Sequence, residues 1–183
     1  MIKKMIKTVL PESFRRAVRK IEKRVRYFYR RLLINLPIAA GMPMKIIVGA
    51  ALTYQKGWYS TNEQWLDISN AEDWSRLFKG KALLTHVLSE HVFEHLSREE
   101  TRLALKLIYD HMKPGGRLRI AVPDGYNPDP VYIQHVGING IGADASDHKQ
   151  LLNKDTLTDF LEEVGFAVEM LEGYLKNGDL VQK

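Results

Sequence analysis

The sequence predicts an α/β fold in which a doubly wound, mostly parallel sheet follows an N-terminal basic helix. Short apolar segments alternate with segments of helical spacing, which is typical of a parallel sheet with helices packed on it. The apolar segments lack the polar–apolar alternation of a water-exposed sheet face. Residues 1–40 contain twelve Lys and Arg and two Glu, a net charge of +10, whereas the whole 183-residue chain carries +5. This asymmetry predicts two parts, a basic helix with its linker over 1–43 and an α/β domain over 44–183.

The first expected element is an amphipathic helix over residues 12–33, followed by a linker over 37–44. Apolar and aromatic residues recur there every three or four positions, and nearly all other positions are Arg or Lys. Pro11 and Pro37 are expected to lie outside its two ends. Such a helix could lie on an anionic membrane surface, bind the phosphates of a nucleic acid, or pack its apolar face on a protein. Nucleic acid is the less favoured partner of the first two, because the sequence contains no recognisable nucleic-acid-binding module.

Composition excludes several classes of site. The chain has no cysteine, which excludes disulfides, thiolate nucleophiles and cysteine-ligated metals. Residues 32–52 are mostly apolar, but Pro37, Pro43 and Lys45 argue against a membrane span. The basic sequence before them argues against a signal peptide. We therefore expect a cytoplasmic protein that associates, at most, peripherally with the inner face of the membrane.

The domain is expected to contain five strands of the main sheet, three helices and a last short strand. The expected strands are 45–50, 58–61, 82–89, 117–124 and 166–174, and the expected helices are 71–78, 98–112 and 155–164. Asn70, Ser97 and Asn153 are suited to cap the three helices. Residues 124–150 are expected to form a long polar loop, and Asn177-Gly178 predicts a hairpin turn into the last strand.

Small and polar residues follow the predicted strands. In a parallel sheet, ligands bind beyond the carboxyl ends of the strands. Gly49-Ala50-Ala51 follows the first strand, and small residues there allow a ligand to approach the backbone closely. Asn62 and Glu63 follow the second strand, where a side-chain oxygen can accept hydrogen bonds from ribose hydroxyls. These are features that a nucleotide-like cofactor requires.

The stretch from Ile46 to Tyr174 resembles the class I S-adenosylmethionine-dependent methyltransferases. It is most similar to a bacterial subgroup with the motifs G-x-G, GW-x-x-T-D, LD, EH-x-x-EH-L and KPGG-x-LRI-x-VPD. The matching residues are Gly49-Ala50-Ala51, 57–62 (GWYSTN), Leu66-Asp67, 90–96 (EHVFEHL) and 113–124 (KPGGRLRIAVPD). The resemblance implies a Rossmann-like fold, S-adenosyl-L-methionine as cofactor, and methyl transfer to a small or glycan-like acceptor.

The resemblance also implies a role for each matching position. Gly49, Ala50 and Ala51 would pass under the methionine part of the cofactor, Asn62 or Glu63 would meet the ribose, Asp67 and Ile68 would flank the adenine, and Glu90 and His91 would line the cofactor and face the acceptor. Two positions depart from the pattern, because Ala51 replaces the second glycine and Asn62 replaces the usual acid. These departures leave open a catalytically degenerate, methyltransferase-like binding or scaffold module. A third alternative is a nucleic-acid methyltransferase that uses the basic helix.

Histidines in two loops are the candidate catalytic groups. His91-x-x-Glu94-His95 also matches the inverted zinc-protease motif, but that motif requires a long helix, and here it lies between a strand and a helix cap. We therefore expect no metal site, and Glu94 and His95 could instead only orient their loop. The hypothesis is that His95, Asp124 and His148 converge on the acceptor, where a neutral histidine can accept a proton. In the alternative, His148 only anchors the long loop.

Overall fold

A computed structural model describes residues 11–51 and 53–183 and contains a parallel sheet of four strands in the order β2-β1-β3-β4. The strands are β1 (Met44–Val48), β2 (Tyr59–Ser60), β3 (Leu84–Glu90) and β4 (Met112–Ala121). β1 and β3 are central and contribute the largest share of buried strand residues, which explains their apolar sequences. The predicted α/β class with a mostly parallel sheet is confirmed.

Three helices of the domain begin where the sequence predicts. They are α3 (Ala71–Phe78), α4 (Arg98–His111) and α6 (Lys154–Val164). The side chain of Asn70 accepts a hydrogen bond from the backbone at the start of α3. Ser97 and Asn153 form capping boxes at the starts of α4 and α6. Each cap satisfies N–H groups that have no partner within the helix.

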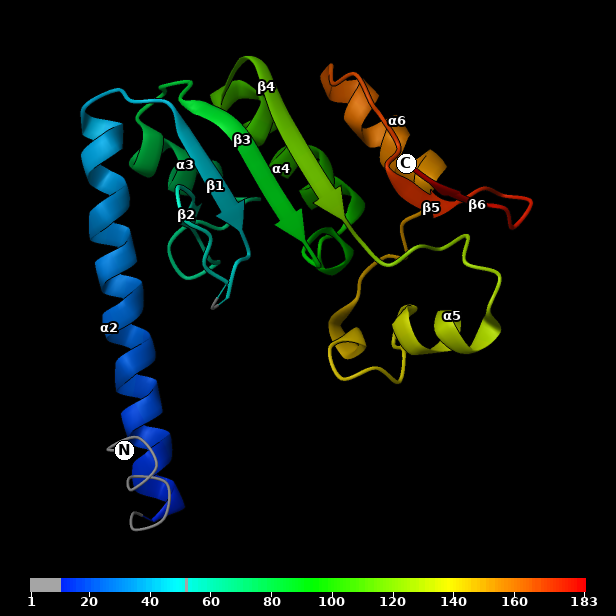
Figure 1. Cartoon of the computed structure of the whole chain (residues 1–183), viewed down its shortest axis with the longest axis horizontal. Helices are drawn as coiled ribbons and strands as arrows, with labels where there is room; N and C mark the ends of the chain where they lie inside the picture. The colour runs from blue at the N-terminus through cyan, green and yellow to red at the C-terminus, as the bar shows by residue number, and fades with distance from the viewer. Residues whose placement is uncertain (1–10, 52) are drawn as a thin grey trace.

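The helices α3 and α4 pack on one face of the sheet (Figure 1). Trp74 and Phe78 of α3 stack with ring centroids 5.4 Å apart, and the ring of His111 at the end of α4 lies 4.9 Å from Trp74. The opposite face carries Lys45 and Arg117 on either side of His86, and both cations are exposed. The connection from β1 to β2 is too short to supply a covering helix there, so the helical cover expected on both faces is found on one.

The basic helix α2 (Glu12–Ala39) is longer than expected, and Pro37 lies inside it rather than beyond its end. The proline lacks the N–H that would bond to the carbonyl of residue 33, and the burial of Ile34 and Ile38 on either side of it stabilises the helix in spite of this loss. Ile34 and Ile38 belong to the hydrophobic core, so the last turns of α2 are part of the domain, and the expected linker over 37–44 begins with helical residues 37–39.

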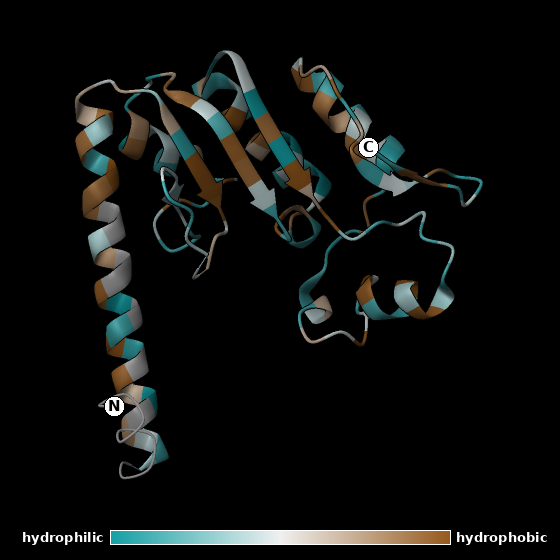
Figure 2. Ribbon diagram, in the orientation of Figure 1, coloured by the Kyte–Doolittle hydropathy of each residue, from teal (hydrophilic) through white to brown (hydrophobic). Residues whose placement is uncertain are grey.

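The earlier turns of α2 extend past the sheet and carry hydrophobic and hydrophilic residues along their length (Figures 1 and 2). Phe14, Ile21, Val25 and Phe28 are all more than half exposed there. Within the described part of the chain, no helix combines the length and the apolar character needed to cross a membrane.

Two expectations for the C-terminal half are wrong. The supposed loop over 124–150 contains the helix α5 (Pro130–Val136), which Asp129 caps, and the 3₁₀ turn η2 (Ala145–Asp147). The expected fifth strand of the main sheet is limited to β5 (Glu172–Tyr174), which forms a separate antiparallel pair with β6 (Leu180–Gln182). The Asn177-Gly178 turn does connect these two strands.

Candidate active site

The turn after β1 has a left-handed backbone at two positions. Gly49 has φ +60° and Ala51 has φ +44°. A Cβ on Gly49 would lie under 3.0 Å from the side chain of Val92, which real Cβ atoms essentially never do. Gly49 is therefore explained by the protein's own packing, whereas Ala51 adopts a conformation that is unfavourable for a residue with a Cβ. The N–H of Ala50 donates to the carbonyl of Thr61 at 2.9 Å and joins this turn to the end of β2.

The predicted ribose and adenine residues follow β2 in a compact turn. The carbonyl of Asn62 accepts hydrogen bonds from the N–H groups of residues 65 and 66, at 3.2 and 3.0 Å, and this turn brings Asp67 back toward the strand end. The Oδ1 atom of Asn62 is buried and has no hydrogen-bond partner among the described residues. Glu63, the other ribose candidate, is exposed. The structure therefore leaves an acceptor at Asn62, where the resemblance places the ribose.

Asp67 and Ile68 are held by local hydrogen bonds. One carboxylate oxygen of Asp67 accepts from the N–H and the hydroxyl of Ser69, at 2.9 and 2.7 Å. Ile68 is buried, and its carbonyl accepts from the indole N–H of Trp74 at 3.0 Å. These bonds fix the segment that is expected to flank the adenine.

Glu90 and His91 lie at the end of β3, and their side chains are exposed. Glu90 forms an ion pair with Arg119 at 3.2 Å on the open face of the sheet. His91 has φ +54°, and its Nδ1 lies 3.2 Å from Oε1 of Glu94. His91 therefore joins the neighbouring 3₁₀ turn η1 (Phe93–His95), which lies between the strand β3 and the cap of α4.

The structure brings His95 and His148 together. Their ring centroids are 4.8 Å apart and the rings are nearly perpendicular, at 77°. The backbone N–H groups of Lys149 and Gln150 donate to the carbonyl of Glu94 at 2.8 and 3.3 Å. The side chain of Gln150 also donates to the carbonyl of Phe93 at 3.0 Å. Two segments more than fifty residues apart in the sequence thus form one structural unit.

Sequence reasoning missed the contribution of Gln150 and the deep burial of Glu94, because both depend on how the two loops meet. An additional hydrogen bond joins the loop that carries Lys149 to the start of α4. Glu100 of the α4 capping box accepts from Nζ of Lys149 at 2.8 Å and from the N–H of Ser97 at 2.6 Å. These hydrogen bonds lower the pKa of the Glu100 carboxyl, and the bond from Lys149 has the largest effect.

Asp124 is held in a different set of contacts. Its Oδ1 accepts from the N–H of Tyr126 at 2.9 Å, and its Oδ2 accepts from the N–H of Tyr174 at 2.6 Å. The carboxylate therefore joins the end of β4 to the C-terminal hairpin. Among the described residues, the carboxylate accepts from these backbone groups rather than from His95 or His148.

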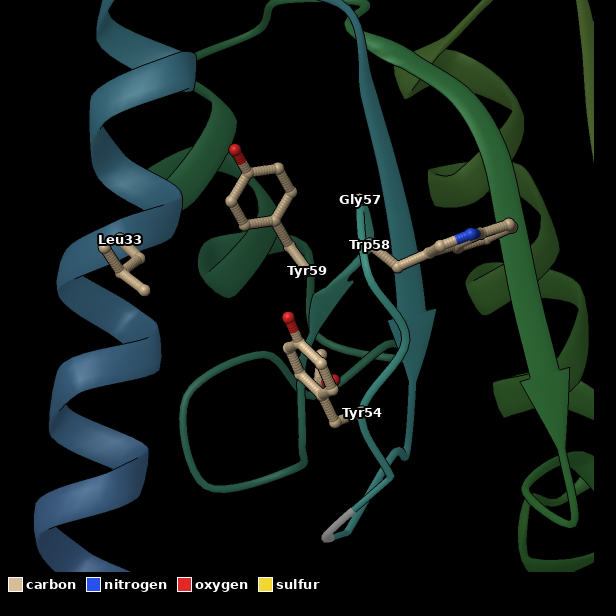
Figure 3. Close-up of a pocket in the computed structure, with 6 residues that line it drawn as sticks. Leu33, Tyr54, Gly57, Trp58 and Tyr59 are labelled. Atoms are coloured by element: carbon tan, nitrogen blue, oxygen red, sulfur yellow. The ribbon is translucent and has the colours of Figure 1, made fainter.

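Two hollows in the surface lie away from the predicted cofactor residues. A small one, of about 220 Å³, lies between Leu33 of α2 and residues 54–60. Figure 3 shows Tyr54 and Tyr59 on the side of α2, whereas Trp58 points the other way across the sheet. A larger one, of about 1560 Å³, lies between β4 and the C-terminal segment. Neither is lined by Gly49, Asn62 or Asp67.

Comparison with known proteins gives a likeness of fold. No protein-family model matches the sequence, and no curated protein matches it. The structure is similar to the crystal structure of a SAM dependent methyltransferase from Archaeoglobus fulgidus, with a TM-score of 0.52 and 18% sequence identity over 83% of this chain and 77% of that chain. The chain therefore shares the α/β fold of a known methyltransferase.

Proposed function

We propose that this protein is an S-adenosylmethionine-dependent methyltransferase that acts on a small or glycan-like acceptor. The fold supports the proposal, and the observation that carries it is the buried, unpartnered Oδ1 of Asn62. Buried polar atoms in folded proteins nearly always have a partner, so an orphan at the carboxyl end of a parallel strand points to a ligand donor. A ribose hydroxyl is such a donor.

The cofactor would be held by three short segments. Residues 49–51 would pass under its methionine part, Asn62 would accept from the ribose, and Asp67 with Ile68 would flank the adenine. The bound cofactor would supply an electrophilic methyl group. The fixed turn after β2 would position the nucleoside, and the methyl of Ala51 and the uncharged amide of Asn62 would both weaken binding.

His95 and His148 are the groups that we propose to face the acceptor. His95 lies just beyond the carboxyl end of β3, in the turn that follows the predicted cofactor residues Glu90 and His91, and His148 meets it from the segment that precedes α6. A carbonyl oxygen can only accept, so the contact of 2.7 Å between Nδ1 of His148 and the carbonyl of Val136 places a proton on Nδ1 and leaves Nε2 as the acceptor nitrogen. An imidazole in this state can receive a proton from a hydroxyl.

Calorimetric titration with S-adenosylhomocysteine tests the proposal. The wild type should bind, and Asn62→Ala should weaken binding. Asn62→Asp should tighten it by about 1 kcal/mol, or about fivefold, because a charged acceptor forms the stronger bond. Glu63→Gln tests the other ribose candidate and should leave the affinity unchanged, because the Glu63 side chain is exposed. Absence of binding at millimolar ligand by the folded wild type would overturn the proposal.

A second candidate function is a methyltransferase-like module that has lost its cofactor and binds partners in a larger assembly. The packing of Val92 against Gly49 favours this second function. It explains why position 49 is a glycine even if no ligand binds there. The same titration separates the two candidates, because only the enzyme responds to S-adenosylhomocysteine.

A further inference from the structure

We propose that Glu94, His95 and His148 bind a divalent transition-metal ion, for which zinc is the best-suited probe. Each of the three side chains offers one ligand atom, and these atoms all lie within 4.8 Å of one another. Two imidazoles and one carboxylate form the donor set of many zinc sites with three protein ligands. This donor set differs from that of the inverted zinc-protease motif, in which both histidines lie on one long helix. Here His91 is exposed, and His148 from another loop is the second histidine of the cluster.

The burial of Glu94 is the second observation that points to a cation. The residue is only 1% exposed. Its Oε1 lies 3.2 Å from Nδ1 of His91, but its Oε2 is buried without a hydrogen-bond partner in the described chain. A buried carboxylate oxygen without a partner is costly, and a metal ion within the cluster would satisfy it.

The groups around the histidines prepare them as ligands. His148 is 8% exposed, and the contact between its Nδ1 and the carbonyl of Val136 leaves the lone pair of Nε2 free. Nδ1 of His95 lies 3.1 Å from Oδ1 of Asp147, yet that contact is too poorly aligned to count as a hydrogen bond. Asp147 is therefore close enough either to orient the ring of His95 or to approach the ion itself.

The backbone holds the ligands in place without a metal. The hydrogen bonds from Lys149 and Gln150 to the carbonyl of Glu94 tie the segment that carries His148 to the turn that carries His95. The side chain of Gln150 also donates to Oγ1 of Thr101 on α4, at 2.7 Å. A preformed cluster of this kind loses less conformational entropy when it binds an ion.

Three protein ligands leave at least one coordination position open, which is typical of catalytic rather than structural zinc sites. Where the proposed function also holds, this position selects an acceptor with a hydroxyl or carboxylate oxygen that can coordinate the ion. The two histidines then act as ligands rather than as bases. The metal site itself does not depend on methyl transfer, so it can be tested in the absence of any cofactor.

The experiment uses the full chain without an affinity tag, treated with a chelator and dialysed. Titration calorimetry with Zn²⁺ should give one ion per chain with micromolar or tighter affinity, and Co²⁺ should give the visible absorption of a site with nitrogen ligands. Glu94→Gln should weaken Zn²⁺ binding at least about 10-fold, because it removes the charge of a ligand, and Asp147→Asn should weaken it less, because the exposed Asp147 carboxylate forms no aligned hydrogen bond with His95. His86→Ala is the matched histidine control and should bind as the wild type does.

Because Glu94 and His148 are buried, their variants could fail to fold, so the wild type provides an independent measurement. Zn²⁺ should raise its melting temperature, and His86→Ala should show the same rise. Absence of Zn²⁺ binding by the folded wild type, or equal affinity in Glu94→Gln, would overturn the proposal. Binding of Mg²⁺ but not Zn²⁺ would overturn it too, since imidazole ligands favour transition metals. Titration with S-adenosylhomocysteine in the chelator-treated protein tests the proposed function separately.

Discussion

Replacement of Gly49 by alanine tests whether the turn after β1 is shaped by the protein's own packing. A Cβ at φ +60° costs about 1–2 kcal/mol of backbone strain, and the collision with Val92 adds an overpacking cost of about 1–3 kcal/mol. Alanine also lowers the conformational entropy of the unfolded chain, and this effect offsets up to about 1 kcal/mol of the loss in stability. We expect Gly49→Ala to lower the free energy of unfolding by about 2–4 kcal/mol.

Gly57→Ala is the matched control for the collision. Gly57 has φ +82°, and no atom lies within 4 Å of its ideal Cβ position. Gly57→Ala should therefore lower the free energy of unfolding only through backbone strain, by about 1 kcal/mol. This corresponds to a fall of about 2–4 °C in Tm for a chain of this size. Chemical denaturation of both variants, of Val92→Ala and of the double variant Gly49→Ala with Val92→Ala measures the collision directly. The double variant should recover about 1–3 kcal/mol relative to the sum of the two single variants. Equal losses in Gly49→Ala and Gly57→Ala, or additive effects in the double variant, would refute the packing argument.

Three further predictions concern the α4 cap and the basic helix. Ser97→Ala should cost about 1 kcal/mol of stability, measured by denaturant unfolding, because the capping box at the start of α4 is lost. The pKa of Glu100 is lowered in the folded protein, so its contribution to stability is present above the unfolded pKa and is lost as the pH falls through the lowered folded value. Glu100→Gln should reduce the acid sensitivity of Tm, and an unchanged pH profile would contradict this assignment. The full chain should float with anionic vesicles at low salt and be released at high salt, because α2 carries exposed apolar residues among many basic ones; equal binding to neutral vesicles would argue against an electrostatic attachment.

The parts of the fold that local chemistry encodes could be predicted from the sequence. The caps at Asn70, Ser97 and Asn153 place three helices, and the apolar runs place the strands. The errors fall where long-range contacts override a local signal. Pro37 looked like a helix end, yet the burial of its neighbours in the core stabilises the helix through it. Residues 166–174 looked like a strand, but for most of their length they pair with no strand in the described structure.

The candidate site follows the same division. Gly49 and Asn62 lie just after strands whose positions the sequence predicts, and Asp67 follows the turn after the second strand, so a local pattern is enough to propose them as ligand-binding residues. Asp124 could be identified for the same reason, but the hydrogen bonds that occupy its carboxylate come partly from Tyr174 of the hairpin. Because each carboxylate oxygen of Asp124 accepts a backbone hydrogen bond, the group holds the end of β4 and the hairpin together in this structure. No local pattern distinguishes such a group from a catalytic one.

The meeting of His95 and His148 carries the argument for the proposed metal site. The two loops are separated by more than fifty residues in the sequence. The backbone hydrogen bonds from Lys149 and Gln150 to the carbonyl of Glu94 hold the two histidines next to each other. A loop that served only as an anchor could be held by those backbone bonds alone, without placing two imidazoles and a buried carboxylate within 4.8 Å of one another. A purely structural contact would be more stable with an apolar or fully bonded group in place of the unpartnered Oε2 of Glu94, because such a group costs less to bury. The unpartnered carboxylate oxygen beside two histidines is what a bound cation would satisfy, and this supports the proposed metal site.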